Sequence, residues 1–95
     1  MEAMTVTIDN LTFDRVDYDV SADVLYLHKG DPSTAVDFDS TPEGHALRFN
    51  AAGEIVGITL VSPRHFLDRD GKLEITLPHH VNVDAGTLDQ ALVAA

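Results

Sequence analysis

Two stretches of this chain decide its fold: residues 18–27 read YDVSADVLYL, and residues 47–58 read LRFNAAGEIVGI. The first ends in an apolar strand in which Leu25 and Leu27 share one face and the neighbouring apolar side chains share the other. The second is a hairpin in which Gly53 supplies the positive φ of a short connection. Because both strands are apolar on both faces, we expect them to lie centrally in a sheet that is covered on both sides.

The other strands are predicted from apolar alternation between turn residues. Strands are expected over residues 4–8, 13–18, 23–28, 35–39, 46–50, 54–61 and 73–77, with a short extended piece at 81–83. In the strand over 35–39, we expect Val36 and Phe38 to point inward and the aspartates between them to point outward.

Two helical segments are expected. Ser62 followed by Pro63 predicts the start of a single helical turn that runs through Leu67. Asp84 is expected to cap a C-terminal helix. The apolar stripe of that helix contains Ala85, Leu88, Ala91 and Leu92.

These elements predict a single domain over residues 1–95 of the α+β class. We expect a mostly antiparallel β-sheet, a meander of about six to seven strands, with a short helical turn and a C-terminal helix. The residues expected to be most buried are Leu25, Leu27, Ile55, Val56, Ile58 and Leu60. Gly57 interrupts the second central strand, which indicates a bulge or a close approach by a neighbour, and we expect Tyr26 to be that neighbour.

Composition excludes several classes of protein. With 44% hydrophobic residues the chain can form a core, and without cysteine it has no disulfide, thiolate zinc site or catalytic thiol. Its formal net charge of −10, from 16 acidic and 6 basic side chains, repels nucleic acid and anionic membranes but fits a basic protein partner. No apolar run approaches the ~20 residues of a membrane helix, and the first residues do not resemble a secretory signal, so we expect a cytoplasmic protein.

Part of the chain resembles a known bacterial family, catalogued as domain of unknown function 2283. The matching segments are YD at 18–19, ADVLYL at 22–27 and GEIVGI at 53–58. The resemblance spans roughly Val16 to Ser62. It departs from the family pattern at Thr59, where many members have glutamate, and at residues 47–50, which are less acidic than the family pattern. The resemblance implies a small β-rich fold without a known activity. It also hints at an interaction role, because some members lie beside small toxin-like proteins.

Five histidines raise the question of a metal site. His79 and His80 are adjacent, so in extended chain they face opposite ways and do not chelate one ion together. His28, His45 and His65 lie on different predicted elements and lack the short spacing of zinc ligands. We therefore predict structural or surface histidines and assign no metal or cofactor site.

Acidic pairs are the other candidates for chemistry. Asp37 with Asp39 and Asp17 with Asp19 each share a strand face, which is typical of a solvated face as well as of paired catalytic carboxylates. The segment 68–71, DRDG, resembles a calcium loop but lacks its closing glutamate, so a turn is expected. Without a nucleophile motif or a phosphate-binding glycine loop, no catalytic residue is assigned.

The sequence therefore favours a non-enzymatic protein-interaction module, with neutralisation of a small basic protein as one role. The alternative is a small-molecule or metal-binding protein that uses His and Asp side chains. A homodimer is expected, because the C-terminal helix covers only one apolar face of the sheet. In the competing arrangement, the N-terminal strand and the turn at 62–67 cover the second face.

Overall fold

The computed structural model describes residues 5–77 and 79–93 and has the predicted α+β fold, with nine antiparallel strands in the described part of the chain. The strands are β1 (Val6–Ile8), β2 (Leu11–Phe13), β3 (Arg15–Asp19), β4 (Val24–His28), β5 (Asp37–Ser40), β6 (Ala46–Phe49), β7 (Ile55–Val61), β8 (Lys72–Thr76) and β9 (His80–Asp84). The helices are α1 (Pro63–Asp70) and α2 (Ala85–Val93), with a short 3₁₀ turn η1 (Pro32–Thr34).

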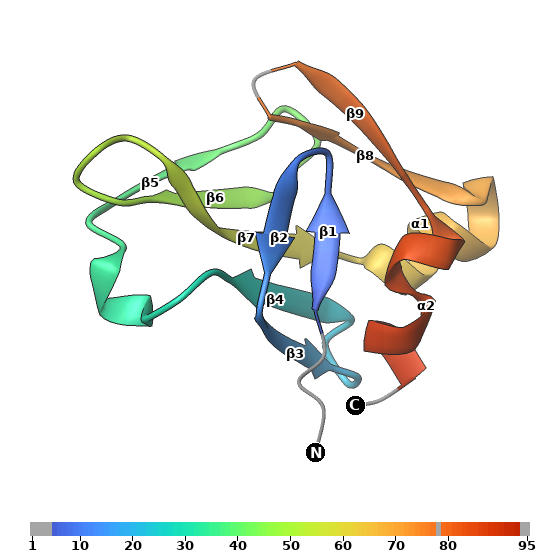
Figure 1. Ribbon diagram of the computed structural model, residues 1–95. Helices are drawn as coiled ribbons and strands as arrows, with labels where there is room; N and C mark the ends of the chain where they lie inside the picture. Colours follow the sequence, from blue (N-terminus) through green and yellow to red (C-terminus); the bar gives the residue numbers. More distant parts are fainter. Residues whose placement is uncertain (1–4, 78, 94–95) are drawn as a thin grey trace.

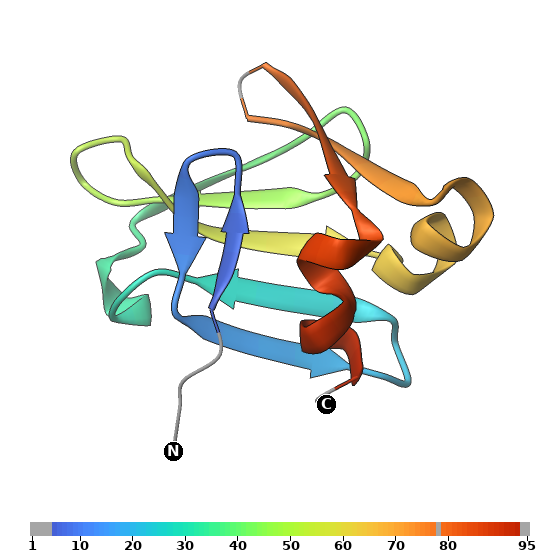
Figure 2. The ribbon, with the colours of Figure 1, turned by 45° about the vertical axis from the view of Figure 1, so that its right-hand side comes forward.

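The strands form one five-stranded sheet and two separate hairpins. The sheet has the order β3-β4-β7-β6-β5, so the prediction that β4 and β7 are central strands is confirmed. Hairpin β1–β2 and helix α2 lie in front of the same face of this sheet (Figures 1 and 2). The predicted strand over 13–18 is instead two strands in different sheets, divided at Asp14. Of the strand predicted over 4–8, Met4 lies outside the described residues.

The core lies between the covered face of the sheet and the elements packed on it. Buried side chains come from the sheet (Leu25, Leu27, Leu47, Ile58, Leu60), from β1 and β2 (Val6, Ile8, Phe13), from β8 and β9 (Leu73, Ile75, Val83) and from α2 (Leu88, Ala91, Leu92). Of the six residues predicted to be most buried, Ile55 is only half-buried. Its neighbour Val56 is buried outside this cluster, beside the segment that begins at Lys29. A register shift at Phe49 explains the positions of both residues. Phe49 pairs with Ile55, and Val56 is left as the extra residue of a bulge.

No element within residues 5–77 and 79–93 covers the opposite face of the sheet, which corrects two predictions. Tyr26 is 45% exposed and Val61 is 40% exposed, so the central strands are not covered on both sides. Val36 and Phe38 do not point inward, because they are 64% and 73% exposed. Apolar alternation shows which residues share a face, but whether another element covers that face depends on tertiary structure.

The first backbone N–H groups of helix α1 are capped by an acceptor from the turn that precedes β4. Proline occupies the first turn as predicted, but Ser62 has a φ of 56° and its side chain makes no capping hydrogen bond. Instead the carboxylate of Asp23 accepts the backbone N–H groups of Arg64 (3.1 Å) and His65 (3.2 Å), and also the hydroxyl of Tyr18 (2.7 Å). This contact stabilises a helix of eight residues, longer than the single turn predicted.

At other turns and helix ends, the residues predicted from the sequence have the expected roles. Gly53 has a φ of 80° in the β6–β7 connection, and Gly71 ends α1 with a φ of 72°. Asp84 caps α2, because its Oδ1 accepts the N–H of Thr87 at 2.9 Å. These signals depend only on near neighbours in sequence, which is why they are readable without a structure.

Gly57 is closely approached, as predicted, but by different side chains. It pairs with His28 on β4 and with Arg48 on β6, whereas Tyr26 pairs with Thr59. A Cβ atom on Gly57 would lie 3.2 Å from both the Arg48 Cβ and the His28 Cδ2. These distances leave no room for a branched side chain without movement of both neighbours.

Replacing Gly57 by valine is therefore expected to destabilise the protein by about 1–3 kcal/mol despite the high β-propensity of valine. Gly57→Ala is the matched control and should cost less, since it adds one methyl group. Urea unfolding of the two variants and the parent measures the difference. A Gly57→Val variant as stable as the parent would show that the neighbours yield without cost.

Candidate functional site

The uncovered side of the five-stranded sheet is the largest candidate surface. Directly paired residues of an antiparallel sheet share a face, so the register defines its members. They are Phe38, Arg48, Gly57, His28 and Arg15 in one cross-strand row, Ser40, Ala46, Thr59, Tyr26 and Asp17 in the next, and Val61, Val24 and Asp19 in the third. We call these residues the open face.

The open face differs in charge from the rest of the molecule. Its members on β4, β7, β6 and β5 include no acidic side chain, although the chain has 16 acidic residues and a net charge of −10. Its only carboxylates are Asp17 and Asp19, on the edge strand β3. The acidic charge is therefore concentrated away from the centre of this surface.

Two shallow hollows mark the open face. One is lined by Phe38, Ser40, Ala46, Arg48 and Thr59, and is bordered by the carboxylate of Asp39 on the edge strand β5. The other lies around Tyr26 and His28 on the β3 side. Neither ring nitrogen of His28 has a hydrogen-bond partner among the described residues. Exposed aromatic rings beside arginine are the side chains that protein interfaces favour.

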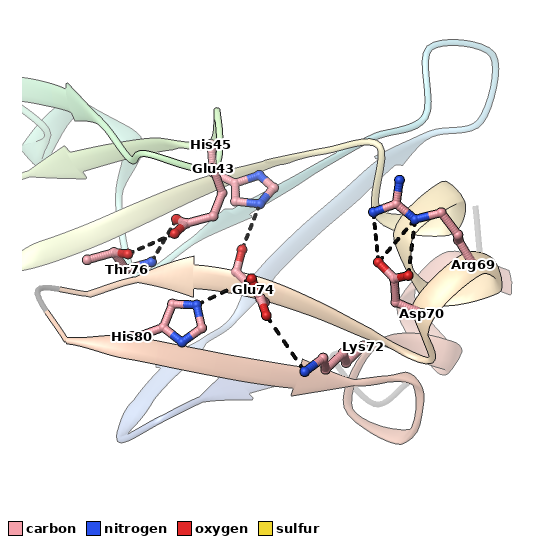
Figure 3. A network of polar contacts seen from close by, with 8 residues as sticks. All are labelled: Glu43, His45, Arg69, Asp70, Lys72, Glu74, Thr76 and His80. Carbon is pink, nitrogen blue, oxygen red and sulfur yellow. Dashed lines mark hydrogen bonds and ion pairs between the residues drawn. The ribbon is translucent and has the colours of Figure 1, made fainter.

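A second candidate lies on the other side of the molecule, around His45, where loop 41–45, α1 and β8 meet (Figure 3). His45 is 1% exposed. Its Nδ1 accepts the N–H of Val61 (3.0 Å), and its Nε2 donates to the carbonyl of Glu74 (3.1 Å), which places the proton on Nε2. Burial lowers the pKa of His45, against smaller opposing effects of the Glu74 carbonyl and the Glu43 charge. His45 is therefore a neutral link between the sheet and β8.

The hollow beside His45 has a volume of about 290 Å³, and four of its charged residues form two pairs. Arg69 pairs with Asp70 at 2.8 Å, and Lys72 lies 3.7 Å from Glu74. Desolvation opposes ionisation of Glu43, but hydrogen bonds from Thr76 and other groups outweigh it and lower the pKa of this carboxyl. A ligand at this hollow would have to displace these internal partners.

The structure separates the remaining histidines. His65 is exposed on α1. His79 lies 3.3 Å from Asp9, and His80 lies 3.4 Å from Glu74, so these two neighbours contact different elements. Within residues 5–77 and 79–93, no three His, Asp or Glu side chains gather in a way that could hold a metal ion.

The acidic pairs lie at the two edges of the sheet. Asp17 and Asp19 are exposed on β3, and Asp37 and Asp39 are exposed on β5. The segment DRDG at 68–71 is not the predicted turn, because Asp68, Arg69 and Asp70 are the last residues of α1 and Gly71 is its cap. The acceptor role of Asp23 was missed, because its partners lie 41 and 42 residues further along the chain.

Comparison of the chain with family models, with curated proteins and with solved structures finds no match in any of the three. The resemblance to domain of unknown function 2283 therefore stays a prediction. Neither helix in the described part of the chain has the length and apolar character needed to cross a membrane.

Proposed function

We propose that this chain is a non-enzymatic protein-interaction module, that the open face is its contact surface, and that the first occupant of this face is a second copy of the chain. The observation that carries the proposal is the absence of carboxylates from the open-face members on β4, β7, β6 and β5, where Tyr26 and Phe38 are exposed.

Charge distribution supports self-association through this surface. Two copies with a net charge of −10 repel each other, and the repulsion is strongest where acidic side chains would meet. Contact through the open face keeps most of these side chains apart. It also buries aromatic rings and Arg48, the residue types in which binding energy concentrates.

The open face can also meet itself across a two-fold axis. A two-fold axis parallel to the strands would lay β3 of one copy over the β5 and β6 side of the other. The rows of the two copies would then match, so Asp17 of each copy would lie one row from Arg48 of its partner and Asp19 two rows from it. Such a contact uses the same patch twice and closes after two copies, so it does not propagate into a filament.

Sedimentation at micromolar concentration in moderate salt is expected to give the mass of a dimer. Replacing both Tyr26 and Phe38 by alanine should weaken the dimer by at least about 30-fold, the effect of losing one central interface residue. Val20→Ala is the matched control, because Val20 is 64% exposed but lies in the turn after β3. A monomer mass for the parent protein, or a dimer unaffected by the double substitution, would contradict the proposal.

A further inference from the structure

The outer edge of β5 has an unusual arrangement of its backbone donors. Among the described residues, β5 is the last strand of the sheet and pairs only with β6. Just beyond it, Thr41 donates its N–H to the carbonyl of His45, on the side of β6. Because successive amides of an extended strand point to opposite sides, the amides of Phe38 and Ser40 point to the free edge.

Both outward amides are occupied by the strand's own acidic side chains. The N–H of Phe38 donates to Oδ1 of Asp37 at 2.9 Å, and the N–H of Ser40 donates to Oδ1 of Asp39 at 2.8 Å. The carboxylates thus cover the two donors through which a further strand would pair. Charges and blocked donors on an edge strand are a known protection against edge-to-edge association.

This protection discriminates between strands by charge. The β5 edge of a second copy would bring four aspartates together and would have to displace all of them from their amides. A strand that carries Lys or Arg would instead neutralise Asp37 and Asp39 and release the amides for pairing. The exposed side chains of Val36 and Phe38 offer apolar contact beside it.

We propose that the outer edge of β5 binds an extended, Lys- or Arg-containing segment of a partner protein as a sixth strand, and that Asp37 and Asp39 select it while they exclude a second copy of this chain. Main-chain pairing supplies affinity in this mode, and side chains at alternate positions supply specificity. The backbone edge of β5 adjoins the open face, to which the side chain of Phe38 belongs. A dimer formed there leaves the β5 edge accessible, so either proposal can fail without the other.

The test uses a ten-residue peptide of alternating Lys and Val, with a Glu–Val peptide for comparison, and the intact protein. Asp37→Asn with Asp39→Asn removes two charges but keeps an oxygen acceptor for each amide. Asp68→Asn with Asp89→Asn is the matched control, because it removes the same charge from exposed sites on the two helices. Fluorescence anisotropy measures binding, and amide hydrogen exchange locates it.

The Lys–Val peptide should bind the parent and the control alike, and should bind the Asp37/Asp39 variant about fivefold or more weakly, since two charge pairs are lost. Exchange at the Phe38 and Ser40 amides should slow when the peptide binds. Equal binding by all three proteins, tighter binding of the Glu–Val peptide, or unchanged exchange at these amides would overturn the proposal.

A further variant distinguishes the effect of the aspartate charges from the effect of the hydrogen bonds that the aspartates accept from the edge amides. Asp37→Ala with Asp39→Ala removes both the charges and the acceptors, so its free edge should pair with other copies and give assemblies larger than those of the Asn variant. Sedimentation of both variants at equal concentration measures this. Identical masses for the two would show that the aspartates do not mask the edge.

Discussion

Replacing Ile58 by alanine is expected to lower the free energy of unfolding by ~2–5 kcal/mol, because it leaves a cavity in the centre of the core. Ile58 is 1% exposed on the central strand β7, where it pairs with Leu27 on one side and Leu47 on the other. Domains of this size have total stabilities of about 5–15 kcal/mol, so the loss is a large share. Leu27→Ala should have a similar effect.

Urea unfolding at a protein concentration low enough to keep the chain monomeric measures this loss, and Val61→Ala is the matched control. Val61 lies on the same strand but on the open face, so its truncation should change stability by only about 0.5 kcal/mol. Equal losses at the two positions would contradict the division of β7 into a buried and an open side.

Replacing His45 by leucine is expected to lower stability by about 2–4 kcal/mol, because it leaves the N–H of Val61 and the carbonyl of Glu74 without their partner inside the protein. The same substitution should change the pH dependence of stability. The pKa of His45 is lowered by burial, so the unfolded chain takes up a proton at a higher pH than the folded protein does. Protonation of His45 therefore favours unfolding.

The contribution of His45 to stability is constant at pH values above about 6.5, the pKa of a histidine in the unfolded chain. Stability is lost as the pH falls below that value. The parent should lose stability between about pH 6.5 and 5, before most carboxylates titrate, and His45→Leu should lose less over this range. His65→Gln is the control, since His65 is exposed on α1. Parallel pH profiles for the parent and His45→Leu would show that the buried imidazole does not limit stability in acid.

The sequence was informative where the signal is local. The apolar runs of β4 and β7, the glycine at position 53 and the capping residue Asp84 each depend on neighbours within a few residues, and the structure confirms all of them. The sequence was uninformative where the partner is distant. Nothing near Asp23 indicates that it holds the start of α1, and nothing near His45 indicates that β8 covers it.

The open face was predictable only in part. Alternation identified Phe38 as sharing a face with Val36, but it placed that face inward, whereas Phe38 is 73% exposed. The stretches from Val24 to His28 and from Gly57 to Val61 contain no acidic residue, but this holds for both faces and does not single out the open one. Whether such a surface meets the core or a partner depends on which elements cover the sheet, and local patterns do not contain that information.

The most direct test of the open face as the contact surface is an isotope-filtered NOE experiment on a mixture of labelled and unlabelled protein. Intermolecular NOEs are expected from the rings of Tyr26 and Phe38 to the open face of the other copy. Intermolecular NOEs confined to α2 or to the β1–β2 hairpin, or none from a dimer of confirmed mass, would contradict the proposed contact.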